Sequence, residues 1–309
     1  MKRVELLIDE CREQTENSEY NSTTGIQQSE FIRFLNSSQQ SLQNAICKQI
    51  QKIFLAEKNI NILAYQANYS LPDDIFISNR VHAVWFSRTG QDKDLVLLDP
   101  LSMEERSFYP GLYPNGYIRN SGEIILTPPP TVSIVNGLRI SYVKSLPTLD
   151  IRRAKISSVT TSNNSITALS IDLSSYYDKA TLVNNYYASV VSKTGQQKMR
   201  KLPILDINTT TGVVTLDSFN FSDGESIAAG DYLVSGKNAC NVSELPDYCE
   251  DYLINYTIWK ILRRDSSVDS AEQGAELQKM EEDIITLFAN IDENQKHINV
   301  TDYSFFTDN

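Results

Sequence analysis

The sequence predicts a mixed α+β protein in which helices at both ends of the chain enclose two β segments. Apolar residues recur at steps of three and four near both ends, whereas short apolar runs broken by Pro, Gly and Asp fill the middle. The 309 residues are enough for two ordinary cores. We therefore expect a helical core with small β hairpins, together with a separate all-β barrel or sandwich domain.

Two helices are predicted at the N-terminal end. The first is a short amphipathic helix with a stripe of apolar residues, namely Val4, Leu7, Ile8 and Cys11. The second is expected to start with Ser29 as its N-cap and to run to about Glu57. Its apolar stripe consists of Phe31, Leu35, Leu42, Ile46, Ile50, Ile53 and Phe54. Because its other face is polar, this helix must bury one side against a partner surface.

Short strands follow from Tyr65 to Val143, and two hairpins are predicted among them. Ser121-Gly122 is expected to join the strands YIRN and EIIL. Asn136-Gly137, a strong signal for a type I′ turn, is expected to join TVSIV to LRISYV. Pro100 is predicted to start one or two helical turns. Three prolines at 128–130 cannot donate ladder hydrogen bonds, so the segment between the hairpins cannot be a central strand.

A second β region is predicted over residues 154–240. In SITALSIDL, Leu169, Ile171 and Leu173 alternate with more polar residues, as in a half-buried strand. Similar short runs are separated by the turn pairs Thr194-Gly195, Thr211-Gly212 and Asp223-Gly224. This spacing is typical of an all-β barrel or sandwich.

The chain returns to helix after Leu245. One helix is expected from Pro246 to Arg264, and a second carries an apolar seam formed by Leu277, Met280, Ile284, Leu287 and Ile291. Residues 291–309 are predicted to form a flexible C-terminal tail.

Composition limits the function classes. A net charge of −11 argues against a sequence-independent grip on nucleic acid, which depends on Lys and Arg. No secretory signal or membrane-spanning run is predicted. The four cysteines, Cys11, Cys47, Cys240 and Cys249, show no CxxC spacing and are predicted to be reduced and structural.

No catalytic constellation is found. GDYLVSGKN departs from a phosphate loop in spacing, and the histidines His82 and His297 have no ligand-like neighbours. The carboxylate pairs Asp73-Asp74, Glu104-Glu105 and Glu281-Glu282 are interpreted as solvated faces or caps, and Trp85 and Trp259 as core. The basic cluster of Arg152, Arg153 and Lys155 is interpreted as a solvated hinge, with contact to a phosphate backbone as the alternative. We predict no enzyme activity, no catalytic residues, no cofactor and no metal.

The order of the elements resembles a known family. Two N-terminal helices are followed by AYQANYSLPDDIFI, YIRNSGEIILTPPPT and LRISYVKSLPTL, and then by the helical LPDYCEDYLINYTIWKIL. This order resembles head-to-tail adaptor proteins of tailed bacteriophages, also called connector or tail tubular proteins of podovirus-like particles. The resemblance covers about 1–150 and 241–309. It implies a discontinuous adaptor core of 1–153 and 241–309 with an inserted β domain at 154–240, whose ends at Asp150 and Glu244 should lie close together.

The resemblance also implies a function. The family implies a structural virion protein that forms a dodecameric ring between the portal protein and a tail nozzle or tail tube protein. Such a ring assembles in the host cytoplasm, lies at the head-tail interface, touches no membrane, and lets DNA pass through its lumen without specific binding. The β domain would hold a tail fibre, and Tyr303, Phe305 and Phe306 would anchor the C-terminal tail on a partner.

The competing hypothesis is a binding module of another phage tail or baseplate component. In that case the β domain would bind a glycan or a fibre through Tyr176, Tyr177, Tyr186 and Tyr187. Paired tyrosines point to opposite faces of a strand, so at most one of each pair could line a shared groove.

Overall fold

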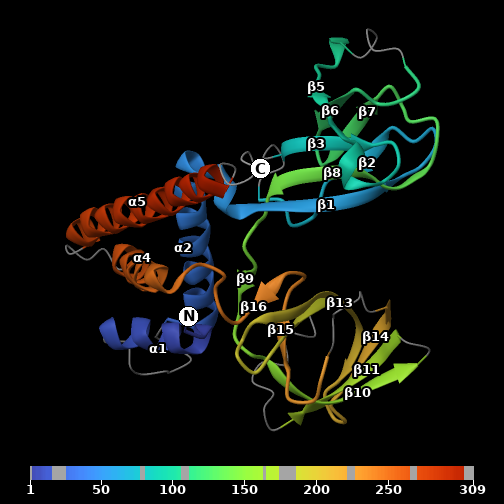
Figure 1. Cartoon of the computed structure of the whole chain (residues 1–309). Coiled ribbons are helices and arrows are strands. Elements are labelled where there is room, and N and C mark those ends of the chain that lie inside the picture. The colour runs from blue at the N-terminus through green and yellow to red at the C-terminus, as the bar shows by residue number, and fades with distance from the viewer. Residues whose placement is uncertain are drawn as a thin grey trace. The chain divides into compact units, whose positions relative to one another are not determined.

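The protein is a mixed α+β chain that separates into two compact units (Figure 1). The computed structural model describes residues 2–15, 26–76, 81–105, 111–162, 165–173, 186–220, 227–264 and 270–302. One unit, here the helix–barrel unit, comprises Met1–Ala45 and Leu146–Asn309. The other, here the β unit, comprises Ile46–Ser145.

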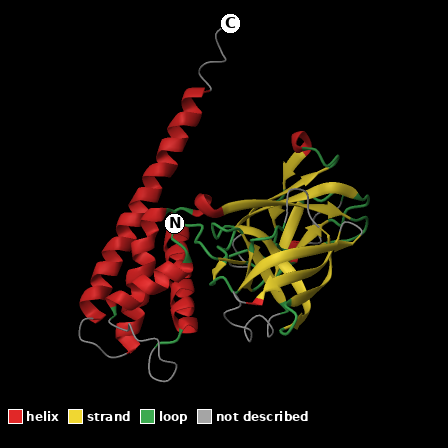
Figure 2. Ribbon diagram, turned by 90° about the horizontal axis from the view of Figure 1, so that it is seen from below, coloured by secondary structure: helices red, strands yellow, loops and turns green. Residues whose placement is uncertain are grey.

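The helices of the helix–barrel unit are coloured red in Figure 2. They are α1 (Val4–Gln14), α2 (Gln28–Gln49), a 3₁₀ turn at Asp247–Cys249, α4 (Glu250–Arg264) and α5 (Ser270–Asp302). The predicted stripe of α1 is confirmed, because Val4, Leu7, Ile8 and Cys11 are all fully buried. Helices α4 and α5 pack side by side. The Tyr252 hydroxyl of α4 donates to Glu281 Oε2 of α5 at 3.0 Å, and the ring centroid of Tyr248, in the 3₁₀ turn before α4, lies 5.6 Å from that of Phe288 on α5.

The second helix is shorter than predicted. α2 begins at Gln28, so Ser29 lies inside its first turn, and it ends at Gln49 instead of near Glu57. A 3₁₀ turn (Gln51–Phe54) follows, and strand β1 (Leu55–Ile62) begins directly after it. Residues Leu55 to Ile60 pair in unbroken antiparallel register with β8 (Ile134–Val143). This long-range pairing outweighs the helical spacing of Ile50, Ile53 and Phe54, since tertiary contacts routinely override local propensity.

Six antiparallel strands of the helix–barrel unit close into a barrel. They are β10 (Ala154–Ser162), β11 (Ser165–Asp172), β12 (Tyr187–Val191), β13 (Gln197–Asn208), β14 (Val213–Asn220) and β15 (Tyr232–Ser235). Their order around the barrel is β10-β11-β14-β13-β12-β15, and β15 returns to pair with β10. Of the two β architectures predicted for this segment, the structure therefore has the barrel. Closure removes the exposed sheet edges that an open sheet would leave.

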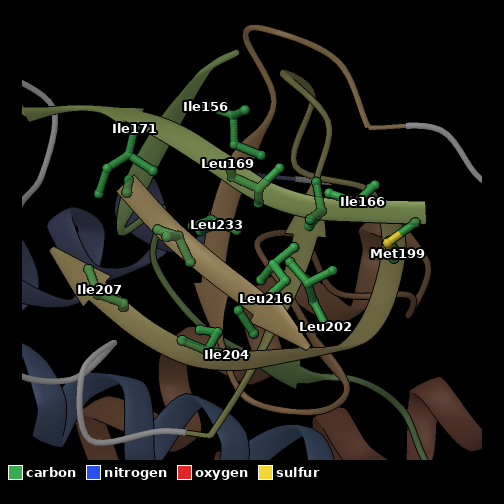
Figure 3. Close-up of a cluster of buried hydrophobic side chains, with 14 residues drawn as sticks. Ile156, Ile166, Leu169, Ile171, Met199, Leu202, Ile204, Ile207, Leu216 and Leu233 are labelled. Carbon is green, nitrogen blue, oxygen red and sulfur yellow. The ribbon is translucent and has the colours of Figure 1, made fainter. Parts of the chain in front are cut away.

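The barrel interior is filled by side chains (Figure 3). Leu169 is fully buried and Ile171 almost so, whereas the neighbouring Ser170 is only half-buried, as the alternation in the sequence predicted. Leu202, Val214 and Leu233 from three other strands are fully buried in the same cluster. Because these side chains occupy the axis, the barrel is a packed core and not a ligand cavity.

The chain enters and leaves the barrel through one narrow connection, here called the neck. It consists of β9 (Thr148–Leu149) and β16 (Ala239–Cys240), which pair in parallel. The Asp150 amide donates to the Cys240 carbonyl at 2.9 Å, and the Asn241 side-chain amide donates to the Asp150 carbonyl at 3.0 Å. The two ends of the barrel segment therefore lie side by side at Asp150 and Asn241, whereas the expectation from the sequence named Asp150 and Glu244.

The β unit contains two four-stranded sheets. The first has the order β1-β8-β3-β4 and adds β3 (Val81–Ser87) and β4 (Leu95–Leu97). The second, β2-β7-β6-β5, consists of β2 (Asn68–Ser70), β5 (Asp99–Pro100), β6 (Gly116–Asn120) and β7 (Glu123–Thr127). The predicted β6–β7 hairpin at Ser121-Gly122 is confirmed. Pro100 lies in strand β5, and residues 106–110 of the segment predicted to contain the helical turns lie outside the described residues.

The hairpin predicted at Asn136-Gly137 is wrong. Both residues lie inside the continuous strand β8, where the register between Ile60 and Ile62 of β1 slips and leaves extra residues on β8. Asn136 has φ +53°, and its amide donates to Asn61 Oδ1 at 2.9 Å. A Cβ on Gly137 would lie 2.8 Å from the Cβ of Ile134 and 3.0 Å from Ile62 Cδ1. The Asn-Gly pair thus supplies the backbone freedom for a bulge within a strand and not for a turn between two strands.

Candidate interaction surfaces

The predicted basic cluster is not a solvated hinge. Arg153 is buried, and its guanidinium donates to both carboxylate oxygens of Asp150. Arg152 pairs with Glu5 at 3.1 Å and stacks over the Tyr232 ring at 4.8 Å. Burial opposes ionisation of Glu5, but hydrogen bonds from the Arg152 amide and Asn241 hold the pKa of Glu5 below its ordinary value. These arginines therefore bind carboxylates beside the neck and are not available to a phosphate backbone.

The cysteines are free thiols, and all four are buried. Burial raises the pKa of Cys11 to about 12 and that of Cys249 to about 12. Since the thiolate is the reactive form, thiols in this state are inert at neutral pH. The prediction of reduced structural cysteines is confirmed.

The carboxylates and histidines do not converge on a catalytic centre within the described residues. Asp74 is buried and accepts a 2.8 Å hydrogen bond from the Tyr142 hydroxyl. His82 lies exposed on β3, and the side chain of His297 falls outside the described residues. In the described part of the chain, no group of three or more His, Cys, Asp or Glu side chains is arranged to hold a metal ion.

The barrel has a surface depression of about 680 Å³ at one of its ends. Its lining includes Ile171, Leu173, Lys193 and Tyr232. The tyrosines predicted to line a shared groove are not brought together there. Tyr176 and Tyr177 lie outside the described residues, Tyr186 is exposed away from this lining, and Tyr187 lies under the Lys237 ammonium at 4.6 Å.

The β unit presents a cluster of exposed apolar side chains at the ends of three loops. We call this set, Leu63, Tyr65, Leu112 and Val132, the apolar loop surface. Tyr65 is 80% exposed and Leu112 is 70% exposed, far more than a core side chain would be. The three loops, at 63–66, 111–114 and 128–133, contain no Asp, Glu, Lys or Arg. Depletion of charge with exposed Tyr and Leu is typical of the centre of a protein–protein interface.

Hydrogen bonds hold these three loops together. The Tyr65 amide donates to the Pro130 carbonyl at 2.7 Å, and the Ala64 amide donates to Ser133 Oγ at 3.0 Å. The Thr131 hydroxyl donates to the Leu112 carbonyl at 3.2 Å. The run of prolines thus supplies a carbonyl acceptor for a neighbouring loop, although it can donate no ladder hydrogen bond.

The backbone of Tyr65 is strained. Its φ is +62°, a left-handed value that aromatic residues seldom adopt. Such conformations persist only where the surroundings impose them, and they cluster at functional sites. Sequence reasoning missed this surface, although an aromatic and two leucines in loops containing Pro and Gly were visible in the sequence.

The predicted C-terminal anchors are not part of the described structure. Tyr303, Phe305 and Phe306 lie outside the described residues. Helix α5 itself continues to Asp302, through part of the segment predicted as a flexible tail.

Comparison with known proteins assigns the family. The model of the family described as SU10 adaptor protein matches residues 3–189, which is more than half of the chain. The chain belongs to the SU10 adaptor protein family. It is therefore a structural adaptor protein of a bacteriophage and a component of the virion. No curated protein matches it.

The matched region differs from the extent of the resemblance noted in the sequence. It crosses residue 154, the predicted start of the inserted β domain, and so includes the neck strand β9 and the barrel strands β10 and β11. It does not reach α4 and α5. Among the described helices of this SU10-type adaptor, none is both long enough and apolar enough to cross a bilayer.

Proposed function

We propose that this adaptor forms a dodecameric ring between the portal protein and the tail nozzle or tail tube protein of a podovirus-like particle. The ring extends the DNA channel below the portal vertex and provides the platform for tail attachment. It assembles in the host cytoplasm. The family match supports an adaptor role in general, and the exposed apolar loops and the negative net charge support the finer assignment.

The observation that carries this proposal is the apolar loop surface. Leu63, Tyr65 and Leu112 are exposed on loops that their own hydrogen bonds make rigid. A rigid loop loses little conformational entropy when it docks, so more of the contact energy appears as affinity. We assign this surface to the contact with a neighbouring virion protein.

The charge of the chain supports passage of DNA through the ring. At −11 the subunit repels phosphates, and copies around a lumen would let DNA slide without specific binding.

Two further contacts complete the proposal. We assign the barrel, as an inserted β domain, to the attachment of a tail fibre. We assign Tyr303, Phe305 and Phe306 to a C-terminal contact that orders on the portal or tail partner.

The test is native mass measurement and negative-stain imaging of the full chain with and without the portal ring of the same phage. A second ring on the portal, with a subunit count equal to that of the portal, is the expected result. Tyr65→Ser with Leu112→Ser should lower the fraction of portals that carry this ring. Tyr186→Ser is the matched control, because Tyr186 is 82% exposed on the barrel and Tyr65 is 80% exposed.

The assignments of the barrel and of the tail are tested separately. Deleting residues 154–240 should leave rings but abolish fibre attachment, and complete fibred tails on that variant would overturn the role of the barrel. Replacing Tyr303, Phe305 and Phe306 with Ser should weaken docking, and unchanged docking would remove them from the interface.

The alternative function is a glycan- or fibre-binding module. The depression at the end of the barrel favours it, because it combines the apolar Ile171 and Leu173 with Tyr232 and Lys193. Binding of the full chain to a glycan array, without any association with a portal, would replace the ring proposal with this one.

A further inference from the structure

Helix α4 presents a stripe of aromatic and basic side chains. Lys260 Nζ lies 5.0 Å from the centroid of the Trp259 ring and 5.2 Å from that of Tyr256. The Arg263 guanidinium lies 5.3 Å from the Trp259 ring. Cations at these distances are attracted to the ring faces. The rings therefore hold both charges in place on one side of the helix; we call these four residues the α4 stripe.

Within the described part of the chain, neither cation of the α4 stripe is neutralised by a carboxylate. Among the described residues, no Asp or Glu lies within 4.0 Å of Lys260 or Arg263. The adjacent Arg264 pairs with Glu30 of α2 at 3.3 Å, and Arg33 pairs with the same carboxylate at 3.6 Å. The end of α4 is thus a locally positive surface on a chain whose net charge is −11.

The opposite charge lies on the outer side of the neighbouring helix. A Cβ on Gly274 of α5 would lie 3.3 Å from Trp259 Nε1, so this position faces α4. Residues two positions away along a helix point about 200° away, which turns Glu272 and Glu276 outward. The exposed side chains on this side are the carboxylates of Glu272, Glu276, Glu282 and Asp283, with the ammonium of Lys279 among them, so the face keeps a net negative charge; we call the four carboxylates the α5 acidic face. In the described part of the chain, Glu272, Glu276 and Asp283 pair with no cation.

We propose that the α4 stripe of one copy docks on the α5 acidic face of the next copy around the ring. This inference rests on the ring of the proposed function and names the contact that closes it. The two surfaces are different and lie on different sides of one helical hairpin. A contact between them is head-to-tail, and repetition of such a contact generates a ring when the rotation closes.

The chemistry of both surfaces fits a second copy of this chain. Tyr256 supplies an aromatic anchor, Trp259 holds the two cations while it packs on Gly274 of its own chain, and the charges of the two faces are of opposite sign. Leu287 is 48% exposed on α5 and adds an apolar contact beside Asp283. DNA is the less favoured occupant, because the acidic face of the adjoining helix would repel a duplex laid along this hairpin.

The contact can be detected directly in the assembled ring. Equal amounts of ¹⁴N- and ¹⁵N-labelled full-length chain are assembled on the portal ring and treated with a carbodiimide, which joins a lysine to a carboxylate without a spacer. We expect mixed-isotope peptides that join Lys260 to Glu272, Glu276 or Asp283. Finding Lys260 joined only within one isotope, or joined to portal peptides, would overturn the proposal.

Charge reversal provides the second test. Lys260→Glu with Arg263→Glu should abolish complete rings, and adding Glu276→Lys with Asp283→Lys to the same chain should restore them. The control reverses two exposed lysines elsewhere, Lys58→Glu with Lys193→Glu, at the same change in net charge, and should leave ring formation intact. The α5 reversals alone should also abolish rings, which keeps the test informative if the α4 variant does not fold.

The outcomes separate this inference from the function on which it rests. If the wild-type chain forms no ring on the portal, the proposed function fails. If the wild-type chain and the α4 reversal form rings equally well, the ring stands and the assigned contact is wrong. If the α4 reversal instead removes retention on a duplex DNA column that the wild-type chain shows, the stripe is a DNA surface.

Discussion

Arg153 and Asp150 form a buried, bidentate ion pair. Its Nε donates to Oδ2 at 2.9 Å and its Nη2 to Oδ1 at 2.7 Å, and both side chains are less than a tenth exposed. The Ser235 amide at the end of β15 donates to the same carboxylate at 2.7 Å. One carboxylate thus binds both Arg153, the residue before the first barrel strand, and Ser235 at the end of the last one.

Removing this carboxylate should be strongly destabilising. Asp150→Ala removes the carboxylate that faces the buried Arg153 guanidinium, and we expect the free energy of unfolding to fall by about 3–5 kcal/mol. Urea unfolding followed by circular dichroism measures this change. Glu30→Ala is the control, because its partners Arg264 and Arg33 are exposed, and it should cost at most about 1 kcal/mol. Equal effects of the two substitutions would contradict the assigned role of Asp150.

Two glycines with similar backbone angles provide a matched pair. Gly90 has φ +74° and Gly122 has φ +80°, so alanine pays a similar conformational penalty at both. A Cβ on Gly90 would lie 2.1 Å from the Val135 carbonyl oxygen, whereas a Cβ on Gly122 would meet nothing within 4 Å. We expect Gly90→Ala to cost about 1–3 kcal/mol more than Gly122→Ala in urea unfolding. If Gly90→Ala costs no more than Gly122→Ala, the loop that contains Gly90 can move away from β8 without a loss of stability.

Substitution of Tyr65 should raise the stability of the chain and at the same time weaken its docking on the portal. Asn tolerates left-handed backbone better than Tyr, so Tyr65→Asn should raise the free energy of unfolding by about 1 kcal/mol. The same substitution removes an aromatic anchor and should lower the fraction of portals that carry the adaptor. Tyr186→Asn should leave this fraction unchanged. A variant that is more stable and docks as well as the wild-type chain would exclude Tyr65 from the interface.

The buried thiols predict a loss of stability in alkali. An unfolded cysteine releases its proton near pH 8.5, whereas burial raises the pKa of Cys11 and of Cys249 to about 12 in the folded chain. Between these values the unfolded state binds fewer protons, so stability falls as pH rises. Each thiol contributes a slope of up to about 1.4 kcal/mol per pH unit.

This slope is best measured between pH 8.5 and 10. Urea unfolding should show a smaller slope for Cys11→Ala than for the wild-type chain over this range. In the native state the thiols should also react with a disulfide reagent only after urea is added. Rapid labelling of the folded protein would contradict the burial of these groups.

The sequence predicted the elements whose patterns are local. The alternation around Leu169 and Ile171 predicted a barrel strand, and the spacing from Val4 to Cys11 predicted α1. Both patterns depend only on which side of an element meets the core.

Elements whose structure depends on pairing with segments far away in the sequence could not be predicted in the same way. Ile50 and Ile53 fit a helical stripe. The segment that follows them nevertheless forms strand β1, because it pairs with β8, some eighty residues later. Asn136-Gly137 carries the signal of a turn, and only the pairing of β8 with β1 shows that the chain continues straight through it.

The candidate surfaces show the same limit. Composition could not reveal that Arg152 has a partner, because Glu5 lies 147 residues away in the sequence. The apolar loop surface is formed by three separate loops, so no single segment of the sequence indicates it.

The neck has a mechanical consequence. Two crossings of the chain join the barrel to the rest of the protein, one arriving from β8 and one leading to α4, and β9, β16, Asp150 and Asn241 bind these crossings to each other. A force applied to the barrel is therefore divided between both crossings, and it must break paired backbone hydrogen bonds before either one can extend.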